Sequence, residues 1–417
     1  MEKLASKYQR KGVCLKTEQL LIPIFLVQVL LGFRVVWRMI RTSGGKHITP
    51  ALRNSEGTLT RKRPSSLAIN KQVSLEHEQV SILVPVLNER TRLKQCLDGL
   101  IEQGKEVAEI IVVDGGSVDG TQAFVSSYAQ RDPRICLIDA SPIPPDWNGK
   151  AWGLEAGLRF ADPASIWILT IDADVRPKAP LALSLLEHAK KENVAALSVA
   201  TLQDIDGLGE GLLHPSLLAT LIYRCGMPGK VFRRANEVQA NGQCFLFRRE
   251  GLEMSGGFQA VRHSLCEDVT IARTLVALGY RVGFYEAEDL VSVKMYADWR
   301  DMWRNWTRSL PMRDRFSEVD TLSGLLEVVF VQALPIPLVF FLATMHMKRS
   351  WFMLLNIVLS ATRMGVLVGT MRVYRRRPWT YWLSPLCDLP VAVKLARSAL
   401  QRRHTWRGRL LVRGGMS

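Results

Sequence analysis

The sequence predicts an α/β fold, in which a mainly parallel, Rossmann-like sheet has helices on both faces and transmembrane helices lie at the N- and C-terminal ends. Two observations predict the sheet. Short apolar stretches alternate with amphipathic ones from residue 79 onward, and the apolar stretches are rich in Val and Ile. Such βαβ order gives parallel strands with helices on both faces. The membrane helices are predicted by apolar stretches long enough to cross roughly 30 Å of hydrocarbon.

The elements of the middle region follow one another in order. Apolar strands are expected at 80–86, 109–114, 135–139 and 165–172. Helices are expected at 90–104, 118–131 and 149–161. The first of these helices has Leu93, Cys96, Leu97, Leu100 and Ile101 at helical spacing, so this set should face the core.

The flanks of the middle region are basic and apolar. The expected segments are a basic N-terminal segment at 1–18, a transmembrane helix at 19–40, a basic linker at 41–78, transmembrane helices at 322–345 and 351–371, a further apolar segment at 379–396, and a basic tail at 397–417. The segment 379–396 contains Asp388 and Lys394, so it either spans the membrane or is re-entrant or interfacial.

The formal charge of +16 is concentrated in these flanks. Residues 1–78 carry 14 Lys and Arg against 5 Asp and Glu, and residues 300–417 carry 19 against 6, whereas the middle is mildly acidic. Basic residues beside long apolar runs favour an anionic lipid bilayer as partner and argue against nucleic acid. The basic cluster at 372–378 favours the cytoplasmic side. We therefore expect an integral membrane protein whose middle domain faces the cytoplasm.

Carboxylates follow the predicted strands at the point where each strand ends. Asp114 ends one strand, and Asp172 and Asp174 follow another. The carboxyl ends of parallel strands meet at one edge of a sheet, where ligands bind. Residues two apart in an extended chain point the same way, and two neighbouring carboxylates repel unless a cation lies near them. Oxygen ligands suit Mg²⁺ or Mn²⁺, and such an ion commonly also holds phosphate oxygens.

These motifs carry a family resemblance. The stretches "VPVLNE", "VVDGGSVDGT", "GKAWGLEAG", "TIDADV" and "CEDVTIARTLVALGYRV" occur in an order and spacing that resemble glycosyltransferase family 2, of the GT-A group that uses nucleotide sugars. The resemblance covers about residues 79–310. The flanks and the closing "HTWRGR" are similar to a membrane-bound subgroup of carotenoid- and hopanoid-associated enzymes, such as chlorobactene glucosyltransferase and myxol 2'-O-glycosyltransferase. The family resemblance implies a GT-A domain at 79–316, with a nucleotide-sugar half at 79–200 and an acceptor half at 201–316.

The resemblance also implies donor-side roles. Pro85 and Glu89 would border the nucleotide, with Asn88 shaping the loop, although a simple strand-to-helix turn explains these three equally well. Asp114 would accept hydrogen bonds from the base, and Lys150 would reach the base or a phosphate unless it is merely solvated.

By the same resemblance, one acidic pair would bind the metal and the other would act on the acceptor. Asp174 would be the direct metal ligand, and Asp172 would lie nearer the ribose or the metal shell. Asp268 would be the base that takes the proton of the acceptor hydroxyl, with Glu267 orienting it or contacting the acceptor. A helix N-terminus is the other reading of Glu267 and Asp268, since acidic residues favour the first turn.

The acceptor half adds further candidates. Gly242 and Gln243 would line the acceptor site, and Arg304 or Arg308 would contact the diphosphate. The stretch that contains these arginines lacks the Q-x-x-R-W pattern of processive relatives, and an amphipathic interfacial helix is the alternative. Residues 210–235 are either a membrane-surface helix or a core helix.

The function implied is that of a membrane-bound inverting glycosyltransferase. It would move a sugar from a nucleotide-diphosphate sugar to a hydroxyl of a lipophilic acceptor, such as a carotenoid or similar terpenoid. A polyprenyl phosphate or a membrane lipid is the next acceptor class, and a processive polysaccharide synthase is an alternative enzyme. A non-catalytic membrane scaffold is the alternative of another class.

Overall fold

The computed structural model describes residues 2–51, 78–264, 266–309, 318–344, 350–400, 403–406 and 409–412. The chain divides into two compact units. The sheet unit comprises Gly45–Asp204, Pro228–Met295 and Arg403–Ser417. The helical unit comprises Met1–Gly44, Ile205–Met227 and Tyr296–Arg402. Most of the predicted linker at 41–78 lies outside the described residues.

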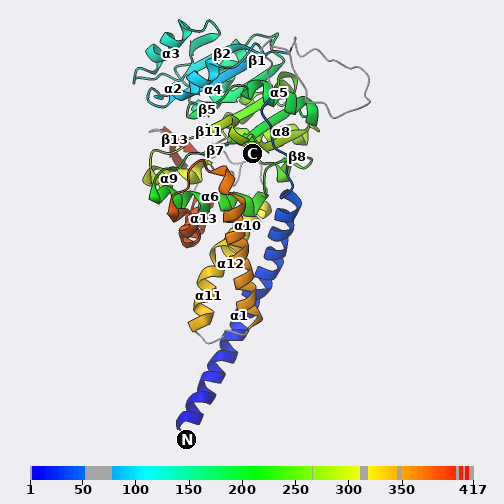
Figure 1. Cartoon of the computed structure of the whole chain (residues 1–417), viewed down its shortest axis with the longest axis vertical. Helices are drawn as coiled ribbons and strands as arrows, with labels where there is room; N and C mark the ends of the chain where they lie inside the picture. The colour runs from blue at the N-terminus through cyan, green and yellow to red at the C-terminus, as the bar shows by residue number, and fades with distance from the viewer. Residues whose placement is uncertain are drawn as a thin grey trace. The chain divides into compact units, whose positions relative to one another are not determined.

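Within the described residues, eight strands of the sheet unit form one mixed sheet in the order β3-β2-β1-β4-β9-β6-β10-β8. Figure 1 labels three of them, β1, β2 and β8. Its strands are β1 (Val80–Val86), β2 (Val107–Asp114), β3 (Ile135–Asp139), β4 (Trp167–Ile171), β6 (Ala196–Ala200), β8 (Lys230–Phe232), β9 (Cys244–Arg248) and β10 (Val282–Glu286). Strands β3, β2, β1 and β4 pair in parallel, as do β6 and β10, whereas β9 and β8 are antiparallel to their neighbours. The mainly parallel sheet is confirmed.

Smaller strand sets complete this unit. One three-stranded sheet joins β5 (Val175–Pro177), β11 (Val291–Val293) and β7 (Leu202–Gln203), and one hairpin joins β12 (Arg403–Trp406) and β13 (Arg409–Val412). Strand β5 begins directly after Asp174.

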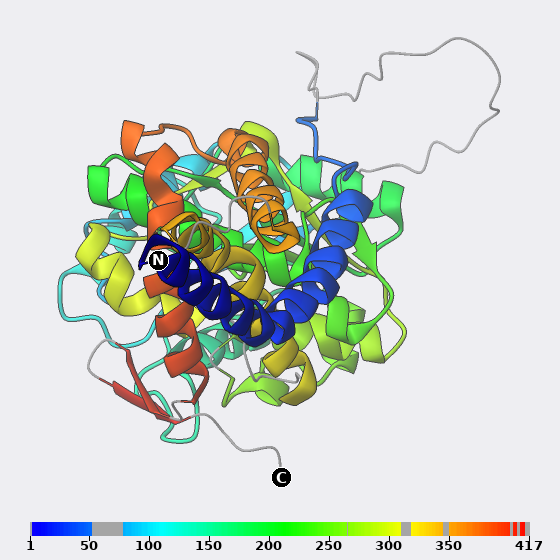
Figure 2. The same cartoon turned by 90° about the horizontal axis from the view of Figure 1, so that it is seen from below.

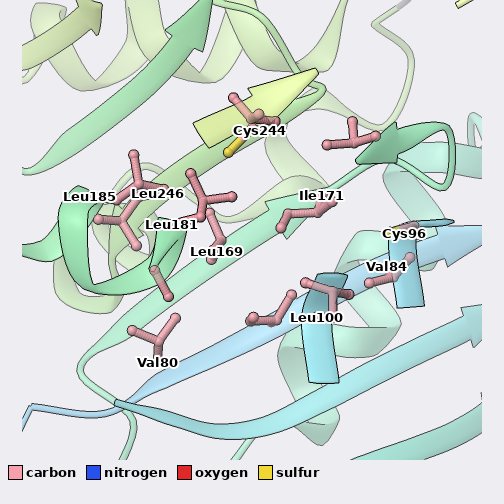
Figure 3. Close-up of a cluster of buried hydrophobic side chains, with 14 of the residues drawn as sticks. Val80, Val84, Cys96, Leu100, Leu169, Ile171, Leu181, Leu185, Cys244 and Leu246 are labelled. Atoms are coloured by element: carbon pink, nitrogen blue, oxygen red, sulfur yellow. The ribbon is translucent and has the colours of Figure 1, made fainter. Parts of the chain in front are cut away.

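Helices cover both faces of the large sheet, as predicted. They are α2 (Leu93–Ile101), α3 (Thr121–Ala129), α4 (Gly149–Phe160), α5 (Leu181–Glu192), α7 (Arg249–Met254) and α8 (Glu267–Ala277). Helices α2, α3 and α5 pack on one face, and α4, α7 and α8 pack on the other. Figure 3 shows the first face, where Leu100 of α2 and Leu181 of α5 lie among strand side chains such as Val84 and Leu169.

The helical unit has its own set of helices. They are α1 (Glu2–Thr42), α6 (Leu208–Cys225), α9 (Trp299–Asn305), α10 (Glu318–Glu327), the π-helix Val328–Ala333, α11 (Pro335–Thr344), α12 (Trp351–Gly369), the 3₁₀ helix Trp379–Cys387 and α13 (Asp388–Leu400). Shorter 3₁₀ turns in the two units are Ala235–Glu237, Phe258–Val261, Glu288–Leu290, Trp306–Ser309 and Met371–Val373. The predicted basic segment at 1–18 is the start of helix α1. Helix α6 buries residues around most of its circumference, which makes it a core helix of this unit.

Two helical stretches of the described residues are long and apolar enough to cross a membrane, Ile22–Thr42 and Trp351–Val373. They coincide with two of the predicted segments. The predicted segment at 322–345 corresponds to two helical stretches, Glu318–Ala333 and Pro335–Thr344, bent by 47°. Together they are long and apolar enough for a third span, so they form either a broken span or a re-entrant loop. Proline at 335 lacks the N–H that would continue the helix, and a π-helical turn precedes it. Both views place α11 beside α12 (Figure 2).

The predicted segment at 379–396 is not among these candidate spans. It forms the 3₁₀ helix Trp379–Cys387 followed by α13, and Asp388 at the junction is 1% exposed. The Asp388 carboxylate accepts hydrogen bonds from Ser216 Oγ (2.5 Å), Gln332 Nε2 (2.9 Å) and Arg363 Nε (2.7 Å). One carboxylate at the start of α13 therefore ties together α6, the π-helix and α12.

We expect Asp388→Ala to destabilise the helical unit by about 3–5 kcal/mol, because it leaves the buried Arg363 guanidinium without its anion. The measurement is thermal unfolding of the full chain in neutral detergent. The matched control is the double variant Arg363→Met/Asp388→Leu, which removes both charges and is expected to recover most of the loss. A double variant as unstable as Asp388→Ala alone would contradict this role.

Candidate active site

The strands that carry the predicted acidic residues are neighbours in the sheet. Strand β1 lies between β2 and β4, and Val86 at its end pairs with Asp114 at the end of β2. Asp172 directly follows β4 on the other side of β1. The strand order reverses at this point, which is where open α/β sheets bind ligands. The predicted meeting of strand ends is therefore present.

Lys150 lies at the centre of the acidic groups. Its Nζ is 2.8 Å from Asp172 Oδ1 and 2.8 Å from Glu267 Oε1. It comes from the first turn of α4, whose N-terminus is capped by the Asn148 side chain. Burial disfavours the charged ammonium, but the carboxylates of Asp172, Glu267 and Asp268 outweigh burial and raise the pKa of Lys150. Lys150 thus joins Asp172 at the strand end to Glu267 at the start of α8.

Asp174 has one oxygen without a partner. Its Oδ1 is buried and, among the described residues, makes no hydrogen bond. Its Oδ2 is 4.0 Å from Arg92 Nη1, at the edge of an ion pair. Burial and then the neighbouring Asp172 carboxylate raise the pKa of Asp174 to about 7. A buried carboxylate oxygen with no donor costs free energy that a bound cation would offset.

Asp268 lies at the start of α8 beside Lys150. Its Oδ2 accepts from the Gly242 backbone N–H at 2.6 Å, and its Oδ1 accepts from its neighbour Val269 N at 2.8 Å. Burial and then Glu267 raise the pKa of Asp268 to about 7. Asp268 therefore lies in the first turn of a helix, which confirms the helix start expected from the sequence. A carboxylic acid with a pKa near neutrality is suited to accept a proton, and the role of Asp268 as the base stays a prediction.

Gly242 and Gln243 connect the two acidic pairs. A Cβ on Gly242 would lie 2.9 Å from Lys150 Nζ and 3.2 Å from Asp268 Cβ, so a side chain there would press on both. The Gln243 carbonyl accepts from Asp172 N at 3.1 Å. The Gln243 side chain is buried and accepts from Thr201 Oγ1 at 2.6 Å. Gln243 thus fixes the backbone of Asp172 through its carbonyl and is itself anchored to Thr201. The acceptor contacts of Gly242 and Gln243 stay predictions.

Asp114 is fully buried and accepts hydrogen bonds from the loop that follows it and from helix α3. Its Oδ2 accepts from Gly116 N (3.1 Å), Ser117 N (2.8 Å) and Gln122 Nε2 (2.7 Å), and its Oδ1 accepts from the Ser117 hydroxyl. In this arrangement Asp114 shapes the loop after β2. A contact to a nucleotide base stays a prediction.

The loop after β1 is joined to the loop after β2. Asn88 has a positive φ of 56°, accepts from Val118 N at 2.9 Å and donates its own N–H to Ser117 Oγ at 2.8 Å. Glu89 is buried and pairs with Arg92 at 2.9 Å, while Pro85 is half-buried on β1. These contacts support the shaping role expected of Asn88, and the nucleotide contacts of Pro85 and Glu89 stay predictions.

Arg304 and Arg308 belong to the helical unit. Arg304 is exposed in the last turn of α9, and Arg308 lies in the following 3₁₀ turn Trp306–Ser309. Their contact with a diphosphate stays a prediction.

Two residues of the site were not expected from the sequence. Arg92 pairs with Glu89 and lies 4.0 Å from Asp174. The pair with Glu89 could have been found in the sequence, because residues three apart on a helical turn are neighbours. Asn148 donates its Nδ2 to Ser264 O at 2.8 Å, which fixes the start of α4 to the loop before α8. Nothing in the sequence indicates that second contact, because it joins residues 116 positions apart.

Parts of the chain are similar to known proteins. Residues 81–255 match the family model of glycosyl transferase family 2, which covers Asp114, Lys150 and the Asp172–Asp174 pair. A 4,4'-diaponeurosporenoate glycosyltransferase from Staphylococcus aureus strain MRSA252 is 22% identical over 245 residues, which are 58% of this chain and 63% of the relative. The same enzyme from strain USA300 matches to the same extent. The chain thus spans less than two thirds of these relatives.

Among solved structures, a mannosyltransferase from Pyrobaculum calidifontis in complex with GDP-Man and Mn²⁺ is 18% identical, with 89% of this chain and 99% of that chain covered and a TM-score of 0.47. A glucosyl-3-phosphoglycerate synthase from Mycobacterium tuberculosis in complex with Mn²⁺, UDP and phosphoglyceric acid is 20% identical, with 50% and 68% covered and a TM-score of 0.34.

Proposed function

We propose that this chain, whose residues 81–255 form a glycosyl transferase family 2 domain, moves a sugar from a nucleotide-diphosphate sugar to a hydroxyl of a lipophilic acceptor. The observation that carries the proposal is the meeting of two acidic pairs on Lys150, one from the strand edge and one from the start of α8. A donor bound at the first pair would have its reacting carbon beside the second.

The donor side offers a place for Mg²⁺ or Mn²⁺. No three His, Cys, Asp or Glu of the described ranges gather to hold a metal by themselves. The unpartnered Oδ1 of Asp174 fits a cation whose other ligands come from the diphosphate and water, with Asp172 in its shell. Such an ion would offset the charge that develops on the leaving diphosphate. Arg92 lies 4.0 Å from Asp174 Oδ2, so Oδ1 is the oxygen of Asp174 that would be available to the cation.

The acceptor side supplies the base. Asp268 takes the proton of the acceptor hydroxyl while the acceptor oxygen bonds to the anomeric carbon of the sugar. At the same time, the bond from that carbon to the diphosphate oxygen breaks. Attack from the face opposite the leaving group inverts the configuration. The Gly242 N–H holds one oxygen of Asp268 in place, and Glu267 forms an ion pair with Lys150.

The acceptor is inferred from the surroundings of the domain. Two stretches of the described residues are candidate membrane spans, and a relative is named as a 4,4'-diaponeurosporenoate glycosyltransferase. We infer a carotenoid or similar terpenoid acceptor, and a catalytic domain that faces the cytoplasm, where nucleotide sugars are made.

The proposal is tested with purified full-length protein in vesicles that contain carotenoid alcohols and acids. Radiolabelled UDP- and GDP-sugars with Mn²⁺ are supplied, and the lipid extract is analysed by mass spectrometry. We expect one hexose or pentose added per acceptor. Labelled polymer in place of a single addition, or hydrolysis without transfer to any lipid, would contradict it.

Transfer is expected to depend on pH through Asp268. Its pKa is raised to about 7, and only the ionised form accepts a proton, so the rate should rise as pH increases toward 7 and level off above it. At saturating donor and metal, we expect the rate to fall about tenfold per pH unit well below that pKa. A rate that stays flat down to about pH 5, near the ordinary range of a carboxylic acid, would remove Asp268 from this role.

Lys150→Met is expected to weaken donor binding and to shift the acid limb of the pH profile upward. The substitution removes the cation that lowers the pKa of Asp268 and leaves Asp172 facing Glu267. The measurement is the pH profile of kcat, since a merely structural lysine would change the amount of active protein and not the titration midpoint. Lys178→Met, on the exposed loop before α5, is the control and should leave the profile unchanged.

A further inference from the structure

The helical unit contains a pocket of about 620 Å³ between α9 and α13. Its lining includes two cations, Lys394 and Arg397, one aromatic ring, Trp303, and the apolar side chains of Leu389 and Val393. No Asp or Glu of the described residues is among the lining groups. The pocket is therefore both positively charged and partly apolar.

Lys394 is held in position by Trp303. Its ammonium lies 4.4 Å from the centre of the Trp303 ring and donates to the Trp303 backbone carbonyl. An ammonium has three N–H donors, and this contact uses one of them. The remaining donors are available to an anion, and the lysine loses little further freedom when it binds one.

Arg397 interrupts an exposed apolar face. Leu389, Val393, Arg397 and Leu400 follow one another on α13 at spacings of four, four and three residues, so they share one face. The three apolar members are 42%, 50% and 76% exposed. Within the part of the chain that the structure describes, Arg397 takes part in no ion pair. A cation within an exposed apolar stripe suits a helix that lies along a membrane surface at headgroup depth.

We propose that this pocket binds the phosphate headgroup of an anionic phospholipid of the bilayer. Lys394 and Arg397 contact the phosphate, and the acyl chains lie along Leu389 and Val393. Basic pockets beside membrane helices recognise such headgroups through charge, and the apolar stripe supplies a contact that a free phosphate ion cannot use. The site lies outside the acidic site of the sheet unit and does not depend on sugar transfer.

The test measures lipid binding by the full chain in neutral detergent. Pyrene-labelled phosphatidylglycerol is titrated in, and energy transfer from tryptophan reports occupancy. Lys394→Gln/Arg397→Gln is expected to weaken binding by about tenfold or more, since each basic residue near a lipid surface adds appreciable attraction. The matched control is Arg375→Gln/Arg376→Gln, which removes the same charge from the basic cluster after α12 and should change the affinity by less than about twofold.

Competition separates the possible ligands. Unlabelled phosphatidylglycerol should displace the probe, whereas phosphatidylcholine and soluble glycerol phosphate at equal concentration should not. Unchanged binding by the pocket variant, equal displacement by phosphatidylcholine, or equal displacement by glycerol phosphate would each overturn the proposal. If the double variant fails to fold, Arg397→Glu decides, because Arg397 is exposed and its replacement leaves the Lys394–Trp303 contact intact.

Discussion

Asp174→Asn is expected to abolish metal-dependent binding of the nucleotide sugar. The amide keeps the size of the side chain but removes the negative charge that would hold a divalent cation, and Asp172 is already paired with Lys150 at 2.8 Å. Without the charge that Asp174 supplies, we expect transfer to fall by about 10³-fold, which corresponds to roughly 4 kcal/mol of transition-state stabilisation. Calorimetric titration of UDP- and GDP-sugars with and without Mn²⁺ measures the binding step.

The control for this variant is Asp162→Asn. Asp162 lies in the exposed loop that precedes β4, at the opposite end of the strand that Asp172 follows, so the same chemical change there should leave donor affinity unchanged. Wild-type Mn²⁺ dependence in Asp174→Asn would remove Asp174 from the metal site. A gain in thermal stability of the metal-free variant is also expected, since the unpartnered buried oxygen no longer belongs to a charged group.

Asp268→Asn is expected to keep donor binding and to lose transfer by about 10²–10⁴-fold, the range for removal of a general base. Asparagine can still accept from the Gly242 N–H through its carbonyl oxygen, so the local fold should survive. The amide cannot take up the acceptor proton. Single-turnover transfer with donor and metal bound separates the chemical step from binding.

The control for the second variant is Asp289→Asn, on an exposed turn of the same unit, which should transfer at the wild-type rate. Asp268→Asn with an unchanged rate would assign the base to another residue. A loss of donor affinity equal to the loss of rate would instead mean that Asp268 only supports the donor site.

Local periodicity was sufficient to predict the first half of the sheet. The apolar runs that form β1, β2, β3 and β4 are nearly continuous. Parallel strands that are buried on both faces typically have such continuous apolar sequences. The spacing of Leu93, Cys96 and Leu97 likewise predicted the buried face of α2. The antiparallel insertion of β9 between β4 and β6 has no local signal, because β9 pairs with β4 across more than 70 residues of sequence.

For the candidate site as well, the sequence predicted the residues but not the contacts between them. Asp172, Asp174 and Asp268 were predicted from strand ends, a helix start and the family resemblance, and the structure brings Asp172 and Asp268 together around Lys150. The ion pairs of Lys150 with Asp172 and Glu267 were not predictable, because these carboxylates lie 22 and 117 positions along the chain from Lys150 and the contacts depend on side-chain conformations. The hydrogen bonds of Asp114 were also not expected, although the Gly-Gly-Ser sequence that follows it supplies three of the four donors.

In the proposed mechanism, the strand-end carboxylates gather around one divalent cation and a diphosphate. The most direct measurement is a crystal structure of the full chain with Mn²⁺ and a nucleoside diphosphate, with anomalous scattering recorded at the manganese edge. We expect one anomalous peak in contact with the Asp174 carboxylate and with oxygens of both phosphates. A nucleotide bound without a peak there, or a peak held by residues other than Asp172 and Asp174, would contradict the account.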